Sequence, residues 1–218
     1  MAWVLNDDKK EIQLISNWPG QPVLGISNKV PTAVTYRTTE PHDFISWGFE
    51  ATGRRNREES EPFTWFKLLL QPPTASSEID MAAHSPELST ITRLLENYGK
   101  TAEDVTADYL REIWNYTRRQ LGQILGENFM TDYSVRVVLT IPAVWTPSSI
   151  KLARRLAHRA GFPEHIELVP EPEAAAVAVL RESTTRPHLK VGDVITICDA
   201  GGGTCVSYGL ILKIGNGE

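Results

Sequence analysis

Cysteine is scarce in this chain, and long hydrophobic runs are absent. The 218 residues include 2 cysteines, Cys198 and Cys205, fewer than the disulfide framework of a small secreted protein needs. No apolar run approaches the ~20 residues of a membrane-spanning helix. Residues 1–5 are followed at once by the polar segment 6–10 and not by the apolar core of a signal peptide. We therefore expect a cytoplasmic protein that has no membrane partner.

The chain also has fewer basic than acidic residues. The chain has 22 Lys and Arg residues against 27 Asp and Glu residues, a net charge of −5. Nucleic acids select basic surfaces because their phosphates are negative. The one basic run, residues 54–57, is followed at once by Glu58 and Glu59. We expect no nucleic-acid partner.

Several enzyme motifs are missing from the sequence. It contains no Gly-x-Ser-x-Gly nucleophile motif and no Walker loop. A ribonuclease-H-like nuclease would need clustered acids, and the strand expected at residues 135–141 has none. Five histidines are scattered without the spacing of metal ligands, so each is interpreted as a surface or packing residue: His42, His84, His158, His165 and His188.

The sequence does contain a β-branched run followed by an acid and a glycine-rich turn. Residues 194–197 predict a buried strand, which places Asp199 at its carboxyl end, where open sheets bind ligands. The glycines at 201–203 allow a tight turn whose N–H groups face an anion. Thr204 offers a hydroxyl, and the carboxylate of Asp199 suits a hydrated Mg²⁺. This combination favours a nucleotide phosphate; the alternative is a glycine-rich hairpin turn without a ligand.

The first half of the sequence predicts strands and then helices. A capping pattern, Thr101 with Asp104, begins a long helix in which apolar residues recur at helical spacing as far as Leu125. The predicted strands are residues 2–5, 11–16, 30–36 and 44–49, of which the first two form a hairpin, and the other helices are residues 63–70 and 86–98.

The second half alternates strands with helices. Strands are predicted at residues 135–141, 166–169 and 194–197, and helices at residues 147–160 and 173–181. Alternation of this kind indicates a parallel sheet covered by helices. Together with the earlier strands and the long helix, the order predicts an α/β protein, a ribonuclease-H-like half-domain with a mixed sheet and flanking helices.

Four segments resemble the heat shock protein 70 family, in the order and spacing that the family has. Residues 137–143, VVLTIPA, are similar to its VVITVPA strand, and residues 153–162, ARRLAHRAGF, look like the helix after that strand. Residues 170–176, PEPEAAA, are similar to its NEPTAAA segment, and residues 199–204, DAGGGT, to its second phosphate loop, DLGGGT. Residues 29–32 stand near its TTPS segment.

The resemblance implies an actin-like ATPase fold, in which two ribonuclease-H-like halves close on Mg·ATP. By this resemblance Asp199 holds Mg²⁺ through water, Glu171 orients the metal shell or the attacking water, and Pro142 is a hinge that reports the bound nucleotide. Lys67 matches a lysine that approaches the γ-phosphate, or else is a lysine on a helix surface. The implied cofactor is ATP or ADP with Mg²⁺, and the residues implied to bind it are Gly201, Gly202, Gly203 and Thr204.

The resemblance also predicts how the chain is divided. Residues 1–185 are expected to be the first lobe of the nucleotide-binding domain, with an inserted subdomain at about 37–100. Residues 186–218 are expected to be the first hairpin of the second lobe, so that the second half is only begun. The family's first phosphate loop is missing, and Cys205 and Val206 stand where the family continues with a hydrophobic residue and a second acid. We therefore expect a divergent, truncated relative of the family.

These departures weaken the expected activity. Three or four charge-assisted hydrogen bonds from one phosphate loop contribute roughly 5–12 kcal/mol. The loss of translational and rotational freedom on ATP binding costs about 4–15 kcal/mol. Micromolar affinity needs a net binding free energy of about 8 kcal/mol, which one loop does not supply. We expect a partial nucleotide-binding domain, an ATPase by resemblance, whose ATP binding is weak or lost and which is inactive as this chain.

The alternative function is a scaffold that keeps the fold for contacts with other proteins. Such a protein would need neither the metal nor the phosphate loop, because binding would rest on its surface alone. Co-chaperones or other proteins are the further partners considered under both hypotheses, beside the nucleotide.

The hairpin expected within residues 194–214 would lack the neighbouring strands of its sheet, and a lone two-stranded ribbon is marginal in water. We therefore predict that residues 194–218 are loosely held and that their backbone amides exchange rapidly with solvent. Hydrogen exchange measured by mass spectrometry checks this expectation, and strong protection in these residues would contradict it.

Overall fold

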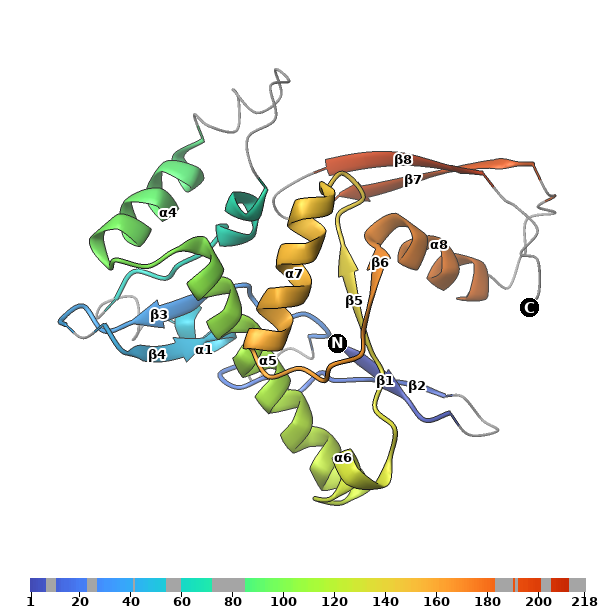
Figure 1. The fold of residues 1–218 in the computed structure, drawn as a ribbon, viewed down its shortest axis with the longest axis horizontal. Helices are drawn as coiled ribbons and strands as arrows, with labels where there is room; N and C mark the ends of the chain where they lie inside the picture. Colours follow the sequence, from blue (N-terminus) through green and yellow to red (C-terminus); the bar gives the residue numbers. More distant parts are fainter. Residues whose placement is uncertain are drawn as a thin grey trace. The chain divides into compact units, whose positions relative to one another are not determined.

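The computed structural model describes residues 1–6, 11–22, 27–40, 42–53, 60–71, 85–182, 190, 192–200 and 205–211, and these form a mixed α/β structure (Figure 1). The chain divides into two units. Unit 1 comprises Met1–Val135 and Leu152–Glu164, and unit 2 comprises Arg136–Lys151 and His165–Glu218. The predicted α/β class is confirmed, whereas the predicted lobes, which meet at residues 185 and 186, stay a prediction.

Two antiparallel strand pairs form the sheets of unit 1. β1 (Ala2–Val4) pairs with β2 (Ile12–Leu14), which confirms the predicted hairpin. β3 (Val34–Tyr36) pairs with β4 (Phe44–Trp47). All four strands are shorter than the runs of apolar residues that predict them, because pairing ends before the apolar pattern does.

A glycine sets the end of β4. Gly48 has φ +61°, a left-handed conformation that residues with a side chain rarely adopt, and α1 (Gly48–Thr52) begins there. A Cβ atom at this position would lie 2.7 Å from Val30 Cγ2, so a larger residue would also clash. The strand predicted for residues 44–49 is therefore wrong for its last two residues.

The helix predicted for residues 63–70 is wrong in its first half. Phe63 instead forms a β-bridge with Val34, in which Phe63 N donates to Val34 O at 2.8 Å and Val34 N donates to Phe63 O at 3.2 Å. Only Phe66–Leu70 is helical, as the 3₁₀-helix η1. The bridge satisfies backbone groups of Phe63, whose side chain is fully buried, and tertiary pairing thus overrides the local helical pattern.

The two longer helices of unit 1 that precede Gly126 begin at side-chain caps, and the cap at Thr101 was predicted. Ser85 Oγ accepts a backbone hydrogen bond at 3.1 Å at the start of α4 (Pro86–Asn97). At the start of α5 (Ala102–Leu125), Asp104 N donates to Thr101 Oγ1 at 3.1 Å and Thr101 N donates to Asp104 Oδ2 at 2.9 Å. This is a complete capping box, formed with aspartate in the position where glutamate is more common.

A short helix, α6 (Phe129–Asp132), follows α5 and packs against it. The side chain of Phe129 is buried there. None of the described helices combines the length and the apolar composition that crossing a bilayer requires.

An aromatic core holds the strands of unit 1 against α5. Tyr36 is fully buried, its hydroxyl donates to Asp108 Oδ2 at 2.8 Å, and Arg111 pairs with Asp108 Oδ1 at 2.6 Å. Burial, together with the negative charge of Asp108, raises the pKa of Tyr36 far above its usual value, so the phenol remains a neutral donor. The buried hydrophobic residues of this core are Ile15, Trp18, Val34, Tyr36, Trp47, Phe63, Phe66, Ile91, Leu94, Leu95, Val105, Tyr109 and Tyr116.

The end of α7 (Pro147–Arg159) contacts α5, because Arg159 pairs with Asp104. Gly161, with φ +88°, turns the chain out of the helix, and Phe162 N donates to Ala157 O at 3.1 Å. This turn places the ring of Phe162 on that of Trp114, with the centroids 4.8 Å apart and the planes at 22°. Both side chains are buried, so the helix end is held by a stacked aromatic pair.

The described strands of unit 2 form one parallel and one antiparallel pair. β5 (Val137–Ile141) and β6 (Ile166–Pro170) are parallel, as predicted. β7 (Val194–Ala200) and β8 (Cys205–Ile211) form an antiparallel hairpin. α8 (Glu171–Glu182) packs against β5, β6 and β7.

Unit 2 also departs from the expected pattern. α8 begins at Glu171, two residues earlier than predicted, and β7 continues to Ala200, three residues further than predicted. The described strands of the chain pair two by two, in four separate sheets. A single mixed sheet of the ribonuclease-H-like kind is not seen among the described strands and stays a prediction.

Replacing Phe162 by alanine is predicted to lower the free energy of unfolding by about 3–5 kcal/mol, because the change leaves a cavity against Trp114. The matched control is Ile124→Ala on α5, where the side chain is 57% exposed; there the change should be within about 0.5 kcal/mol. Unfolding in urea measures both variants. Equal, small effects would contradict the packing role of Phe162.

Asp104 connects the start of α5 to the end of α7. Besides its contacts with Thr101, its carboxylate accepts a hydrogen bond from Arg159 Nη2 at 2.5 Å. Partial burial by itself raises the pKa of Asp104, but the hydrogen bonds from Thr101 and Arg159 outweigh it and lower the pKa to about 2. The ionised form of Asp104 therefore stabilises the fold.

The stability that Asp104 supplies is fully present above its ordinary pKa of 3.8 and is lost as the pH falls towards 2. Asp104→Asn is predicted to lower the free energy of unfolding at neutral pH by about 1–2 kcal/mol. The variant should also lose part of the pH dependence below pH 4. Glu103→Gln is the control, since Glu103 pairs with an Arg155 side chain that is 67% exposed. Urea unfolding across this pH range would contradict the prediction if both variants behaved alike.

Candidate functional site

The carboxyl ends of β5 and β6 lie side by side in unit 2. Their register pairs Ile141 with Pro170, the last residue of each strand. Pro142 follows Ile141 and Glu171 follows Pro170. The parallel register therefore brings two predicted site residues, Pro142 and Glu171, next to each other at the end of the sheet where α/β proteins bind ligands.

Helix α8 begins directly at this end of the sheet. Its second residue, Pro172, is fully buried, and proline fits there because the first N–H groups of a helix have no partner within the helix. Glu171 is half-buried and Glu173 is exposed. Both carboxylates lie in the first turn, where the partial positive charge of the helix N-terminus stabilises them. The buried Pro172 thus lies between two glutamates in the chain.

β7 leads the chain towards the same end of unit 2. β7 packs against α8 and in Figure 1 runs back along the helix, so that its carboxyl end lies towards the start of α8. The backbone of Asp199 pairs with Val206 of β8, whereas the side chain of Asp199 is not described. We call Pro142, Glu171 and the carboxyl end of β7 the strand-end site.

The predicted phosphate loop lies outside the described residues, so its role stays a prediction. It comprises Gly201, Gly202, Gly203 and Thr204. Within the described part of the chain, no group of three or more His, Cys, Asp or Glu side chains is placed to hold a metal ion. Because the Asp199 side chain is not in that part, this finding does not test the predicted Mg²⁺ ligand.

Lys67, the remaining predicted site residue, belongs to unit 1. It is the second residue of η1, and its side chain is exposed. Its match to a lysine that approaches the γ-phosphate stays a prediction.

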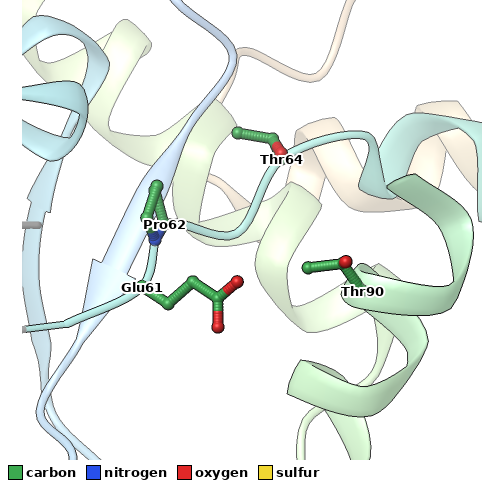
Figure 2. Close-up of a pocket in the computed structure, with 4 residues that line it drawn as sticks. All are labelled: Glu61, Pro62, Thr64 and Thr90. Atoms are coloured by element: carbon green, nitrogen blue, oxygen red, sulfur yellow. The ribbon is translucent and has the colours of Figure 1, made fainter. Parts of the chain in front are cut away.

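Unit 1 has an open pocket of about 490 Å³ that the sequence did not indicate (Figure 2). Glu61, Pro62 and Thr64 line it from the segment before η1, and Thr90 lines it from α4. Glu61 is paired with Arg93 at 2.8 Å. The lining thus consists of one carboxylate, one proline and two threonines.

Glu173, two residues after Glu171, was not singled out by the sequence analysis. The prediction began the helix at residue 173 and gave this acid no role. The signal was present in the motif, because PEPEAAA has glutamate where NEPTAAA has threonine. The structure shows that the helix starts at Glu171, which puts residue 173 in the same turn as the predicted site residue.

Two curated proteins are similar to this chain over most of its length. The mouse (Mus musculus) heat shock 70 kDa protein 12A is 27% identical over 186 residues, which cover 81% of this chain and 26% of that protein. The human (Homo sapiens) protein of the same name is 26% identical over 186 residues, with the same coverage. No family model matches the chain. The chain thus spans about a quarter of the length of these relatives, and the resemblance to heat shock 70 kDa proteins is confirmed as a distant one.

Proposed function

We propose that this distant relative of a heat shock 70 kDa protein contains part of a nucleotide-binding domain, whose strand-end site binds the phosphates of Mg·ATP or Mg·ADP. The proposal rests on the register that pairs Ile141 with Pro170. This register sets Pro142 beside Glu171 at the carboxyl end of a parallel strand pair, where α/β sheets bind nucleotides. The start of α8 lies at the same place, and β7 packs against that helix.

Each residue of the proposed site has a distinct task. The carboxylate of Asp199 would hold water molecules of the Mg²⁺ shell, because hard cations prefer oxygen ligands. The half-buried carboxylate of Glu171 would orient that shell or the attacking water from the first turn of α8. Pro142, directly after β5, would move with the bound nucleotide. The N–H groups of Gly201, Gly202 and Gly203 and the hydroxyl of Thr204 would bind the phosphates.

Weak binding is part of the proposal. The matching segments include one phosphate loop, and the hydrogen bonds of one loop are comparable in free energy with the cost of association. ATP hydrolysis, chaperone activity and contacts with co-chaperones would belong to the whole protein of this kind, of which this chain covers about a quarter by its relatives' length.

A protein-binding scaffold is the second candidate function. The observation that favours it is the exposure of two apolar side chains on α8, Val177 and Val179, which are each 66% exposed. A helix with apolar residues on its solvent side is typical of a surface that another protein covers. This candidate needs no nucleotide, so a binding experiment distinguishes the two.

Titration of the full chain with Mg·ATP is predicted to show a dissociation constant on the order of 1 mM or weaker. Asp199→Asn should abolish the binding heat, because it removes the charge that holds the metal shell, and Glu171→Gln should reduce it. The matched control is Glu167→Gln, an exposed acid earlier in β6 that should leave binding unchanged. Isothermal titration calorimetry measures all four proteins.

Two results would contradict the nucleotide-binding proposal. The first is the absence of binding heat in the unaltered chain at ATP concentrations about tenfold above the expected dissociation constant, which would favour the scaffold. The second is equal heat in the unaltered chain and in Asp199→Asn, which would place any binding elsewhere.

A further inference from the structure

We propose that the pocket of unit 1 binds an extended segment of a partner protein, which pairs as a strand with the free edge of residues 61–64. The occupant is an uncharged, β-forming segment whose side chains carry hydroxyl or amide groups. The proposal concerns unit 1 alone and does not rest on the nucleotide-binding function proposed for unit 2.

The free edge follows from the bridge between Phe63 and Val34. Both backbone groups of Phe63 are used there, since its N–H donates to Val34 O at 2.8 Å and its carbonyl accepts from Val34 N at 3.2 Å. Successive residues of an extended segment direct their backbone groups to opposite sides. The carbonyl of Pro62 and the N–H of Thr64 therefore point away from β3. In the part of the chain that the structure describes, neither group has a hydrogen-bond partner, and unpaired groups of this kind are what an added strand binds.

The pocket lies along the same segment. Glu61, Pro62 and Thr64 line it from the segment and Thr90 lines it from α4. Its volume of about 490 Å³ falls in the range of ligand pockets, roughly 300–1,000 Å³. Figure 2 shows the side chain of Glu61 extending from the segment towards Thr90. A strand bound in the pocket would thus have the edge of residues 61–64 on one side and α4 on the other.

The polar groups around the pocket select an uncharged occupant. Arg93 Nη2 donates to Glu61 Oε2 at 2.8 Å, so the two charges neutralise each other. A charged side chain in the pocket would compete for one of them and leave the other without its partner, which costs affinity. The hydroxyls of Thr64 and Thr90 form no hydrogen bond with a described residue. Each hydroxyl can donate to or accept from a neutral hydroxyl or amide group of the occupant.

Trp65 ends the extended segment directly after Thr64. Its backbone has φ +64° and ψ 0°, a left-handed conformation that residues with a side chain rarely adopt. Strained positions of this kind cluster at ligand-binding sites and persist because the surrounding structure holds them. Phe63 and Phe66, the buried residues on either side, hold this one. The edge is therefore fixed in place before a partner binds.

The test titrates the full chain with a blocked five-residue peptide of alternating threonine and valine, and follows the backbone amide resonances of Thr64 and Thr90 by NMR. We expect both to shift, with a dissociation constant on the order of 1 mM. The same peptide with N-methyl groups on its inner amides cannot donate to the Pro62 carbonyl. It should bind about two- to twelvefold more weakly for each hydrogen bond lost. Replacing the central threonine of the peptide by glutamate or by lysine should also weaken binding.

Two variants of the chain separate the backbone contact from the side-chain contact. Thr64→Pro removes the N–H of the edge and Thr64→Val keeps it, whereas both remove the hydroxyl. Proline fits after Phe63, because the residue before a proline prefers an extended conformation. Thr64→Pro should bind the peptide about two- to twelvefold more weakly than Thr64→Val. Thr131→Val, at an exposed threonine of α6, is the control and should leave binding unchanged.

Three results would overturn the proposal. The first is no shift of either resonance at peptide concentrations about tenfold above the expected dissociation constant, because the contacts involve the backbone that every peptide shares. The second is equal affinity for the plain and the N-methylated peptide, and the third is equal affinity of Thr64→Val and Thr64→Pro. Circular dichroism checks the fold of each variant. If Thr64→Pro does not fold, the comparison of the two peptides decides the outcome alone.

Discussion

The parallel register of β5 and β6 is the constraint on which the proposed site depends. A shift of one residue in either strand would turn its side chains to the opposite face and move Glu171 away from Pro142. The apolar side chains hold the register in place, because Ile141 and Ile166 are buried at opposite ends of the pair. The packing of two isoleucines therefore determines where a proline and a glutamate lie, although neither isoleucine has a chemical task.

The segment that connects β5 with β6 is held in place by other contacts. α7 connects β5 with β6 along the chain, and its end is held in unit 1 by the stacking of Phe162 on Trp114 and by the pairing of Arg159 with Asp104. The same aspartate caps α5, so one carboxylate serves a helix start and a helix end. Such shared contacts couple the segment that precedes β6 to α5, and the loss of one partner weakens more than one element.

The features that the sequence predicted well are those with local causes. The hairpin of β1 and β2, the cap at Thr101, and the alternation of strand and helix after residue 135 all arise from residues close together in the chain. The helix predicted for residues 63–70 failed because Phe63 pairs with the distant Val34. The start of α8 was predicted two residues too late, because prolines usually mark the end of a helix. Here Pro172 occupies the second helical position, which proline tolerates. Of the candidate site, the sequence indicated Pro142, Glu171 and Asp199, but not the strand register that sets the first two at the same end of a parallel pair.

By itself the sequence identified the residues of the proposed phosphate site, namely an acid, three glycines and a hydroxyl after one strand and a glutamate after another, because these motifs are contiguous. It also determined the kinship to heat shock 70 kDa proteins, since four short segments keep their order and spacing. Only the tertiary structure decided that Pro142 and Glu171 are neighbours and that Tyr36 is buried against Asp108, 72 residues away. Contacts between residues far apart in the chain depend on register and packing, and these are settled when the whole of each unit buries its apolar surface together.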